Sequence, residues 1–361
     1  MKLIHTADLH LGSSMASKLP GDKCGERKME LRYTFRRIAD HAVQCGASAV
    51  LLSGDVFDED VPFTADKDFF YHVIKTHPSI SFFYLKGNHD RFSAGPDTDV
   101  PNLFTFDDTV KEYRLGGVSV FGTELSNGED PAQKLGGLYC DPSRINILML
   151  HGQVGSGAGD IKVKSLSGKN LDYLALGHIH SFSVGDIDPR GKYVYSGTPE
   201  GRGFDETGPK GFVLLDTKDA GYGIDFEFIP FASRTVYEIA VDISGAENRE
   251  SAMDIVTNTV SDVSGESIVR VILTGDVRFD TAGIARMLEI MLAGDFYYAG
   301  VKDRTTRGTD AGSLLSDLSI RGEFARSLRD DPALSEDERK LAAELGLKAL
   351  DGTLGDYIAE M

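Results

Sequence analysis

Five short polar clusters carry the side chains of this sequence that could do chemistry. Each cluster follows an apolar run and contains aspartate, asparagine or histidine. These side chains offer oxygen and imidazole ligands without thiolate, a set that suits Mn²⁺, Fe or Zn²⁺ rather than Ca²⁺. The seven candidate ligands are Asp8, His10, Asp55, Asn88, His151, His178 and His180.

The number of these ligands points to two metals. Seven ligands exceed what one metal takes from a protein, whereas two metals sharing one carboxylate would use them all and keep positions open for water and substrate. On an extended chain residues i and i+2 lie on the same side, so Asp8 with His10, and His178 with His180, can converge. Two metals about 4 Å apart can clamp the attacking and leaving oxygens of a displacement at phosphorus and supply hydroxide at neutral pH. The predicted chemistry is phosphoester hydrolysis.

The segment Gly87–Asp90 reads GNHD and places three polar side chains on one turn. Asn88 is neutral and donates oxygen, so we interpret it as a metal ligand. His89 can then protonate the leaving alkoxide, because an imidazole pKa near about 6.5 suits a general acid at neutral pH. A carboxylate, either Asp90 or Asp58, would hold that imidazole protonated and oriented.

Two arginines near the clusters could bind substrate phosphate. Arg91 follows Asp90, and Arg202 lies in the glycine-rich segment 201–203. For both, an exposed arginine without a catalytic role is an equally good interpretation. Three of the remaining histidines lie in helical patterns and are interpreted as packing or surface residues: His41, His72 and His77. His5 is interpreted as a packing residue or as support for the ligands.

The order of the apolar runs predicts an α/β fold. Helical patterns separate some of the runs, and in layered sheets of this kind ligands bind beyond the carboxyl ends of strands. After residue 173 strand patterns follow closely and suggest an antiparallel second sheet packed on the first. The runs that precede the clusters are 3–4, 49–52, 82–85, 145–150 and 173–176, and the helical patterns are 28–45 and 64–76.

The patterns divide the chain into three parts. Residues 1–231 would form the catalytic domain, 232–304 a small α+β cap domain, and 305–361 a helical tail. In the tail, residues 335–338 form a capping box that opens a helix. Its apolar residues more often pack on their own protein than on a partner: Leu341, Leu345 and Leu350.

The composition limits the class of protein. The 361 residues, 41% of them hydrophobic, are enough for a sizeable core and additional small domains. Three cysteines without C-x-x-C spacing indicate a reducing compartment, and the absence of a long apolar run predicts a soluble cytoplasmic protein without membrane segments. The net charge of −18 argues against a broad nucleic-acid-binding face but allows a local one beside bound cations.

The order and spacing of the five clusters resemble the calcineurin-like metallophosphoesterase superfamily over roughly residues 1–231. Within it, HTADLHLG (5–12), LLSGDVFDED (51–60) and SGTPEGRGFDETGPKGF (196–212) look like the SbcD-type DNA-repair exonucleases, in particular their YhaO-like branch. The tail resembles the C-terminal segment of that branch. The resemblance implies a two-sheet sandwich flanked by helices, with a small α+β cap and a helical tail.

The resemblance also implies a role for each candidate residue. Asp55 would bridge two Mn²⁺ ions and His89 would be the proton donor. Some relatives have histidine three residues after the bridging aspartate, where this chain has Asp58, so we interpret Asp58 as an orienting carboxylate instead. One metal would be held by Asp8, His10, Asp55 and His180, and the other by Asp55, Asn88, His151 and His178.

The partners implied by the resemblance are DNA and a long coiled-coil ATPase of the ABC/SMC type. The ATPase would dock on the C-terminal helices, the cap would face DNA, and the protein would form a dimer. We therefore expect a Mn²⁺-dependent exonuclease or endonuclease. The alternative keeps the site but hydrolyses a small-molecule phosphoester, which the acidic net charge favours. A catalytically silent scaffold would lack ligands, and this chain has all seven and His89.

Overall fold

A computed structural model describes residues 1–15, 19, 21–58, 64–90, 100–126, 128–217, 224–307, 315, 318–329 and 331–350. The chain divides into two compact units. The first contains residues 1–238 and 266–269, and the second contains 239–265 and 270–361. The division of the chain at residues 231 and 304 stays a prediction.

The first unit is built on two six-stranded sheets. The first sheet has the order β12 (Asp225–Pro230), β11 (Gly211–Asp216), β1 (Lys2–Thr6), β2 (Ala47–Ser53), β3 (Ser81–Leu85) and β4 (Leu103–Thr105). The second has the order β5 (Lys111–Leu115), β6 (Val118–Gly122), β7 (Ile145–His151), β8 (Tyr173–Gly177), β10 (Lys192–Tyr195) and β9 (Ser183–Asp186). Strands β1 to β4 run parallel to one another, as do β6, β7, β8 and β10.

The expected separate antiparallel sheet after residue 173 is wrong. Strands β9 and β10 extend the sheet that contains β8, and β10 runs parallel to β8. Strands β11 and β12 instead return to the first sheet, where β11 pairs antiparallel with β1. The layered α/β sandwich flanked by helices is confirmed, but its strands are shared between the sheets differently.

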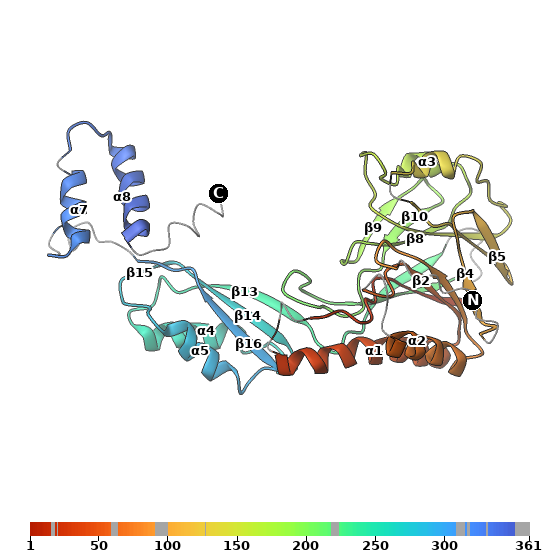
Figure 1. Ribbon diagram of the computed structural model, residues 1–361, viewed down its shortest axis with the longest axis horizontal. Helices are drawn as coiled ribbons and strands as arrows, with labels where there is room; N and C mark the ends of the chain where they lie inside the picture. Colours follow the sequence, from red (N-terminus) through yellow and green to blue (C-terminus); the bar gives the residue numbers. More distant parts are fainter. Residues whose placement is uncertain are drawn as a thin grey trace. The chain divides into compact units, whose positions relative to one another are not determined.

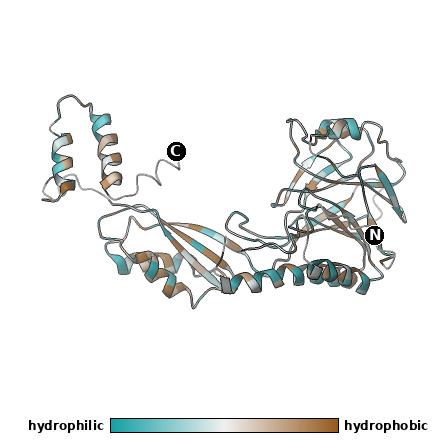
Figure 2. Cartoon of the chain, in the orientation of Figure 1, coloured by the Kyte–Doolittle hydropathy of each residue, from teal (hydrophilic) through white to brown (hydrophobic). Residues whose placement is uncertain are grey.

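Alternating apolar residues build the core between the two sheets. On β7, Ile147 and Met149 lie in the core between the sheets, whereas Leu148 and Leu150 belong to a second apolar cluster that includes Leu135. This is the two-residue period of a strand that is covered on both faces. Figure 2 shows that hydrophobic residues run along the strands of this unit.

Two helices cover the outer face of the first sheet. Helices α1 (Gly21–Gln44) and α2 (Thr64–Thr76) lie side by side along it (Figure 1). Their facing aromatic side chains, Phe35 and Phe70, stack with ring centroids 5.5 Å apart. The short α3 (Pro131–Lys134) and the 3-10 helix η1 (Val163–Leu166) supply Leu166 and neighbouring residues to the cluster outside the second sheet.

The second unit contains most of a three-stranded sheet and the helices that connect its strands. The sheet has the order β13 (Val236–Asp242), β14 (Ile268–Thr274) and β16 (Tyr298–Asp303), with α4 (Arg249–Val260) and α5 (Ile284–Leu292) between its strands in sequence. The predicted alternation of strand and helix between residues 236 and 301 is thus present. A short pair, β15 (Asp276–Val277) and β17 (Thr306–Arg307), follows.

The C-terminal helices form a hairpin within the second unit. Helix α7 (Ile320–Arg329) packs against α8 (Glu336–Leu350). A side chain at Gly346 would come within 2.1 Å of the Phe324 ring, so the glycine lets the aromatic ring approach the helix backbone. Within the described parts of the chain, no helix combines the length and the apolar character needed to cross a membrane.

Candidate metal centre

All seven candidate ligands lie on or directly after the carboxyl ends of five parallel strands. Strands β1, β2 and β3 are neighbours in the first sheet, and β7 and β8 are neighbours in the second. His151 is the last residue of β7, opposite Gly177 at the end of β8. The carboxyl ends of both sheets therefore bring polar segments from distant parts of the sequence to one place, as the sequence predicted.

The segments after β1 and β2 continue side by side beyond the sheet. The Asp8 amide donates to the Gly54 carbonyl at 2.9 Å, and the His10 amide donates to the Asp55 carbonyl at 3.0 Å. Asp8, His10, Asp55 and His178 have positive φ and are four of the six non-glycine residues that do so in the part of the chain that the structure describes. Such backbone conformations are costly and concentrate at functional sites.

Two groups of three side chains converge closely enough to hold a cation. One group is Asp8, His10 and His180, and the other is Asp8, Asp55 and His151, with the ligand atoms of each group within 4.8 Å of one another. In the first group the two Nε2 atoms of His10 and His180 lie 3.2 Å apart. Asp8 belongs to both groups, whereas the resemblance implied Asp55 as the shared ligand. The bridging role of Asp55 stays a prediction.

His151 anchors the second group. Its Nδ1 lies 2.9 Å from the Ser53 carbonyl, which fixes that nitrogen as the donor and leaves Nε2 to face the site. Nε2 lies 3.0 Å from Asn88 Oδ1 and 3.3 Å from Asp55 Oδ2. Burial lowers the pKa of His151, but the hydrogen bond and charge of Asp55 outweigh it and raise that pKa to about 9. A cation binding at Nε2 would displace this proton.

Burial also shifts the pKa values of the other ligands. Burial raises the pKa of Asp8 to about 6, despite the nearby His151 imidazole. Burial alone would raise the pKa of Asp55, but the His151 hydrogen bond holds it well below its usual range. Burial lowers the pKa of both His10 and His178. Neutral imidazoles beside carboxylates are the protonation states that metal coordination requires.

His178 approaches the site through both its backbone and its ring. Its amide donates to the two Asp8 carboxylate oxygens at 3.0 and 3.1 Å. Its ring centroid lies 5.5 Å from that of His151. The structure thus brings all of the sequence-predicted ligands together at the strand ends.

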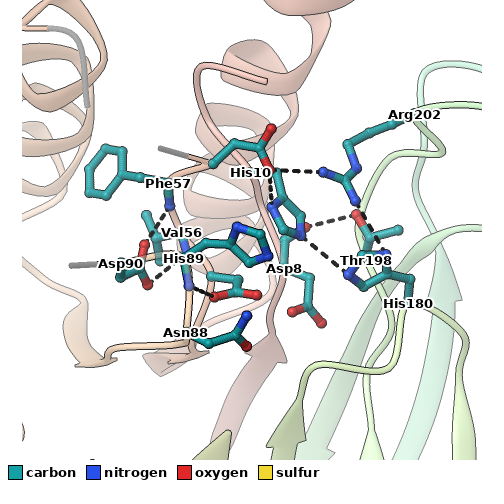
Figure 3. Close-up of polar contacts among 12 residues, drawn as sticks. Asp8, His10, Val56, Phe57, Asn88, His89, Asp90, His180, Thr198 and Arg202 are labelled. Carbon is teal, nitrogen blue, oxygen red and sulfur yellow. Dashed lines mark hydrogen bonds and ion pairs between the residues drawn. The ribbon is translucent and has the colours of Figure 1, made fainter. Parts of the chain in front are cut away.

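A ring of charged groups supports the His10 and His180 side of the site. His10 Nδ1 lies 2.7 Å from Asp58 Oδ1, and the same oxygen accepts from Arg202 at 3.1 Å. Arg202 also donates to Glu206 at 2.7 Å, and Glu206 accepts from His180 Nδ1 at 2.8 Å. Both imidazoles therefore have their Nδ1 held by a carboxylate while Nε2 faces the site. Figure 3 shows His10 and His180 facing one another.

This ring changes the expected roles of Asp58 and Arg202. Asp58 orients His10, a candidate ligand, rather than His89. The Arg202 guanidinium is largely buried and committed to Asp58 and Glu206, so it braces ligands instead of extending toward phosphate. Glu206 was missed by the sequence analysis because it lies 26 residues from His180 in no recognisable spacing. Its only signal is that it lies in the segment 196–212.

Asp90 holds the backbone rather than His89. Its carboxylate accepts hydrogen bonds from the amides of Phe57 at 2.7 Å and Val56 at 3.0 Å (Figure 3). It also accepts from the Gly87 amide at 3.1 Å. The side chain is buried, and burial raises its pKa to about 6 in spite of these donors. Both oxygens are used in this way, so Asp90 fixes the GNHD turn onto the segment after β2.

The same turn leaves His89 exposed at the site. Its amide donates to Asp55 Oδ1 at 2.9 Å, and its ring lies near that of His10, with centroids 5.5 Å apart (Figure 3). The turn must approach Asp55 closely, since a side chain at Gly87 would come within 2.1 Å of Asp55 Oδ1. A side chain at Gly54, which has a φ of +92°, would come within 2.2 Å of His151 Nδ1.

The other predicted residues lie away from the ligand groups or outside the described residues. Arg91 is outside them. His5 is buried, with Nδ1 2.9 Å from the Tyr173 hydroxyl, and burial lowers its pKa to about 3. His77 contacts Asp40 at 2.9 Å, and His72 is exposed on α2. His41 lies between aromatic rings of the first unit.

The donor set fits divalent metal ions. It consists of carboxylate, amide and imidazole groups, and the Nδ1 atoms of His10, His151 and His180 are held by acceptors while Nε2 faces the site. None of the three free cysteines belongs to either group. A layered α/β sandwich with such a centre at its strand ends defines a metal-dependent phosphoester hydrolase.

Comparison with known families places the chain within this class. The family model described as calcineurin-like phosphoesterase matches residues 1–182, half of the chain. The protein belongs to the calcineurin-like phosphoesterase family, as the resemblance of its polar clusters indicated.

Individual relatives share more of the chain. The metallophosphoesterase YhaO of Bacillus subtilis is 28% identical over 304 residues, which cover 76% of this chain and 72% of the relative. The DNA double-strand break repair protein Mre11 of Saccharolobus solfataricus is 24% identical over 377 residues, covering 96% of this chain and 94% of the relative. A dimetal phosphatase structure from Danio rerio matches with a TM-score of 0.42 and 10% identity, covering 64% of this chain and 99% of that one.

Proposed function

We propose that the protein is a Mn²⁺-dependent DNA nuclease that hydrolyses phosphodiester bonds. The observation that carries this proposal is the extent of the similarity to an Mre11 repair protein. It covers 96% of this chain, and so extends far beyond the 182 residues matched by the phosphoesterase family model. Similarity that includes the second unit favours a nuclease over a hydrolase of small phosphoesters.

In the proposed reaction the ligand groups would hold two metals, and His89 would donate a proton. When bound, two divalent metals would supply Lewis acidity at the phosphate and a nucleophile at neutral pH. Asp8, His10 and His180 would hold one of them together with Asp55. The other metal would be held by the other half of the ligand set: Asp55, Asn88, His151 and His178.

His89 is the proposed general acid. It stands one residue after a proposed ligand, and its exposed ring adjoins His10. A proton donor at this position can reach the leaving oxygen of a phosphodiester without entering the ligand groups. Asp58 contacts His10 and Asp90 accepts from backbone amides, so neither orients His89. Asp58 would contribute to catalysis by positioning His10, and Asp90 by positioning the GNHD turn.

The nuclease proposal predicts selective cleavage of DNA. Purified full-length protein loaded with Mn²⁺ should degrade linear or hairpin DNA, and omission of the metal should abolish the reaction. The comparison substrate is bis(p-nitrophenyl) phosphate, a small phosphodiester that tests the site alone. Hydrolysis of this ester with all DNA left intact, even in the presence of the ATPase, would favour the alternative function, a phosphatase or phosphodiesterase for small molecules.

We also propose that an ABC/SMC-type ATPase docks on the C-terminal hairpin, that the α+β cap faces DNA and that the protein acts as a dimer. On the hairpin, Ile320 and Leu341 are exposed apolar side chains. Charges at such positions oppose association with an apolar surface.

The docking proposal predicts separable defects. The double substitution Ile320→Asp and Leu341→Asp should weaken ATPase binding at least about tenfold, a cost of roughly 1.4 kcal/mol, and leave ester hydrolysis unchanged. Ile290→Asp, which changes an exposed apolar residue of α5, is the matched control. Truncation after Thr309 should abolish ATPase binding. Unchanged binding in both the double variant and the truncated protein would refute the assignment, and affinity is measured by surface plasmon resonance.

A further inference from the structure

A buried ion pair lies behind the segment that supports the metal ligands. Arg27 on α1 and Glu200 are both fully buried, and Arg27 Nη2 lies 3.1 Å from Glu200 Oε2. The same guanidinium nitrogen donates to the Gly201 carbonyl at 2.8 Å. Burying two charges is costly unless neighbouring polar groups compensate them. Arg27 also pairs with Glu30, although its Nε has no hydrogen-bond partner among the described residues. The pair therefore fixes the position of Glu200 relative to α1.

Glu200 also connects three separate segments. Its Oε1 accepts from the Thr34 hydroxyl at 2.7 Å and from the Ser233 amide at 2.5 Å. Thr34 belongs to α1, and Ser233 lies in the segment that leads into β13. With Arg27 on its other oxygen, the carboxylate has three charged or polar contacts, which fix its orientation.

The segment that contains Glu200 contacts two members of one ligand group, Asp8 and His180. We name residues 196–210, between β10 and β11, the bracing loop. Within it the Thr198 hydroxyl donates to the Asp8 carbonyl at 2.8 Å, and Glu206 accepts from His180 Nδ1. Lys210, largely buried, donates to the His180 carbonyl at 2.8 Å. Through these side chains the bracing loop holds Asp8 at its backbone and His180 at its ring and carbonyl.

We infer that the Arg27–Glu200 pair is a positioning pair that holds the bracing loop and thereby sets the geometry of the Asp8, His10 and His180 group. The inference rests on the proposed two-metal site and adds a residue pair that touches none of its ligands. The loop contacts Asp8, which both groups share, only at its backbone carbonyl, whereas it holds the ring and the carbonyl of His180, which belongs to one group. Disturbing the pair should therefore weaken the metal site that contains His180 more than the other site.

The test is metal binding by the full-length protein, measured by isothermal titration calorimetry with Mn²⁺ alone. Wild type should bind two ions. In Glu200→Gln the amide keeps an acceptor for Thr34 and Ser233 but faces the Arg27 donors with an N–H group. One of the two sites should lose affinity at least about tenfold, in the range seen when groups that orient metal ligands are removed. The affinity of the other site should stay within twofold of wild type, a change in binding free energy of about 0.4 kcal/mol.

The matched control is Asp172→Asn. Asp172 is a buried carboxylate that pairs with Arg190 at 2.9 Å and accepts from the Asn146 amide, at the opposite end of β7 and β8 from the ligands. It should lower thermal stability as Glu200→Gln does, with both metal affinities retained. Thr34→Val is a milder variant that removes one hydroxyl from Glu200 and should shift the same metal site in the same direction by a smaller factor.

Two results would overturn the inference. One is equal weakening of both sites in Glu200→Gln, and the other is unchanged metal affinity in a folded Glu200→Gln protein. Arg27→Gln and the double variant complete a cycle, and the double variant should lose no more affinity than the worse single variant, because the pair acts as one unit. Failure of wild type to bind two ions would instead contradict the proposed two-metal function, so the two failures are distinguishable.

Discussion

Replacement of His89 by glutamine should lower kcat for DNA about 10²- to 10⁴-fold while both metals stay bound. This is the range expected when a general acid is removed. The His89 ring is exposed beside His10, while its backbone amide, which the substitution keeps, donates to Asp55 Oδ1 at 2.9 Å. The side chain can therefore be changed without removing that backbone hydrogen bond.

The leaving group decides whether His89 acts as an acid. A p-nitrophenolate leaves without a proton, whereas the alkoxide of a nucleoside needs one, so the loss should be large for DNA and small for bis(p-nitrophenyl) phosphate. His72→Gln, at an exposed histidine of α2, is the control and should leave both rates unchanged. An equal loss with both substrates, or loss of bound Mn²⁺ by atomic absorption, would contradict the role of proton donor.

The ligands were predictable because each follows a recognisable apolar run. Five runs end in polar clusters, and parallel strands bring their carboxyl ends to one edge, so Asp8, Asp55 and His151 could be grouped from sequence alone. Supporting contacts carry no such signal. The carboxylate of Asp90 accepts from the amides of Val56 and Phe57, more than 30 residues earlier in the chain, and no local spacing distinguishes that role from orientation of a neighbouring histidine.

The distribution of strands between sheets was less predictable than their existence. Strands such as β10 and β11 are apolar on both faces, so alternation cannot say which neighbour each will join. In the fold β10 pairs with β8 and β11 pairs with β1. Strands β4 to β6 were not predicted. β4 has only three residues, and the exposed side of β5 is charged. Pairing is decided by packing between distant segments.

Substitution of Asp55 by asparagine should have the largest effect on the catalytic site. Asp55 Oδ2 lies 3.3 Å from His151 Nε2, and Oδ1 accepts the His89 amide. An asparagine side chain keeps the shape but loses the negative charge shared by the proposed metals. If Asp55 bridges the two metals, both metals should be lost from the variant. The loss of transition-state stabilisation should be about 5 kcal/mol or more, which lowers kcat/KM roughly 10⁴-fold.

The comparison that isolates bridging is with His10→Asn, whose ligand belongs to one group only. Metal content by atomic absorption should fall from two ions to one in His10→Asn and toward none in Asp55→Asn. Electron paramagnetic resonance of the Mn²⁺-loaded protein should show a spin-coupled pair in wild type alone. The geometry offers a rival, because Asp8 is the carboxylate common to both convergent groups. If Asp8→Asn abolishes the coupled signal and Asp55→Asn retains it, Asp8 is the shared ligand and Asp55 serves only the His151 side.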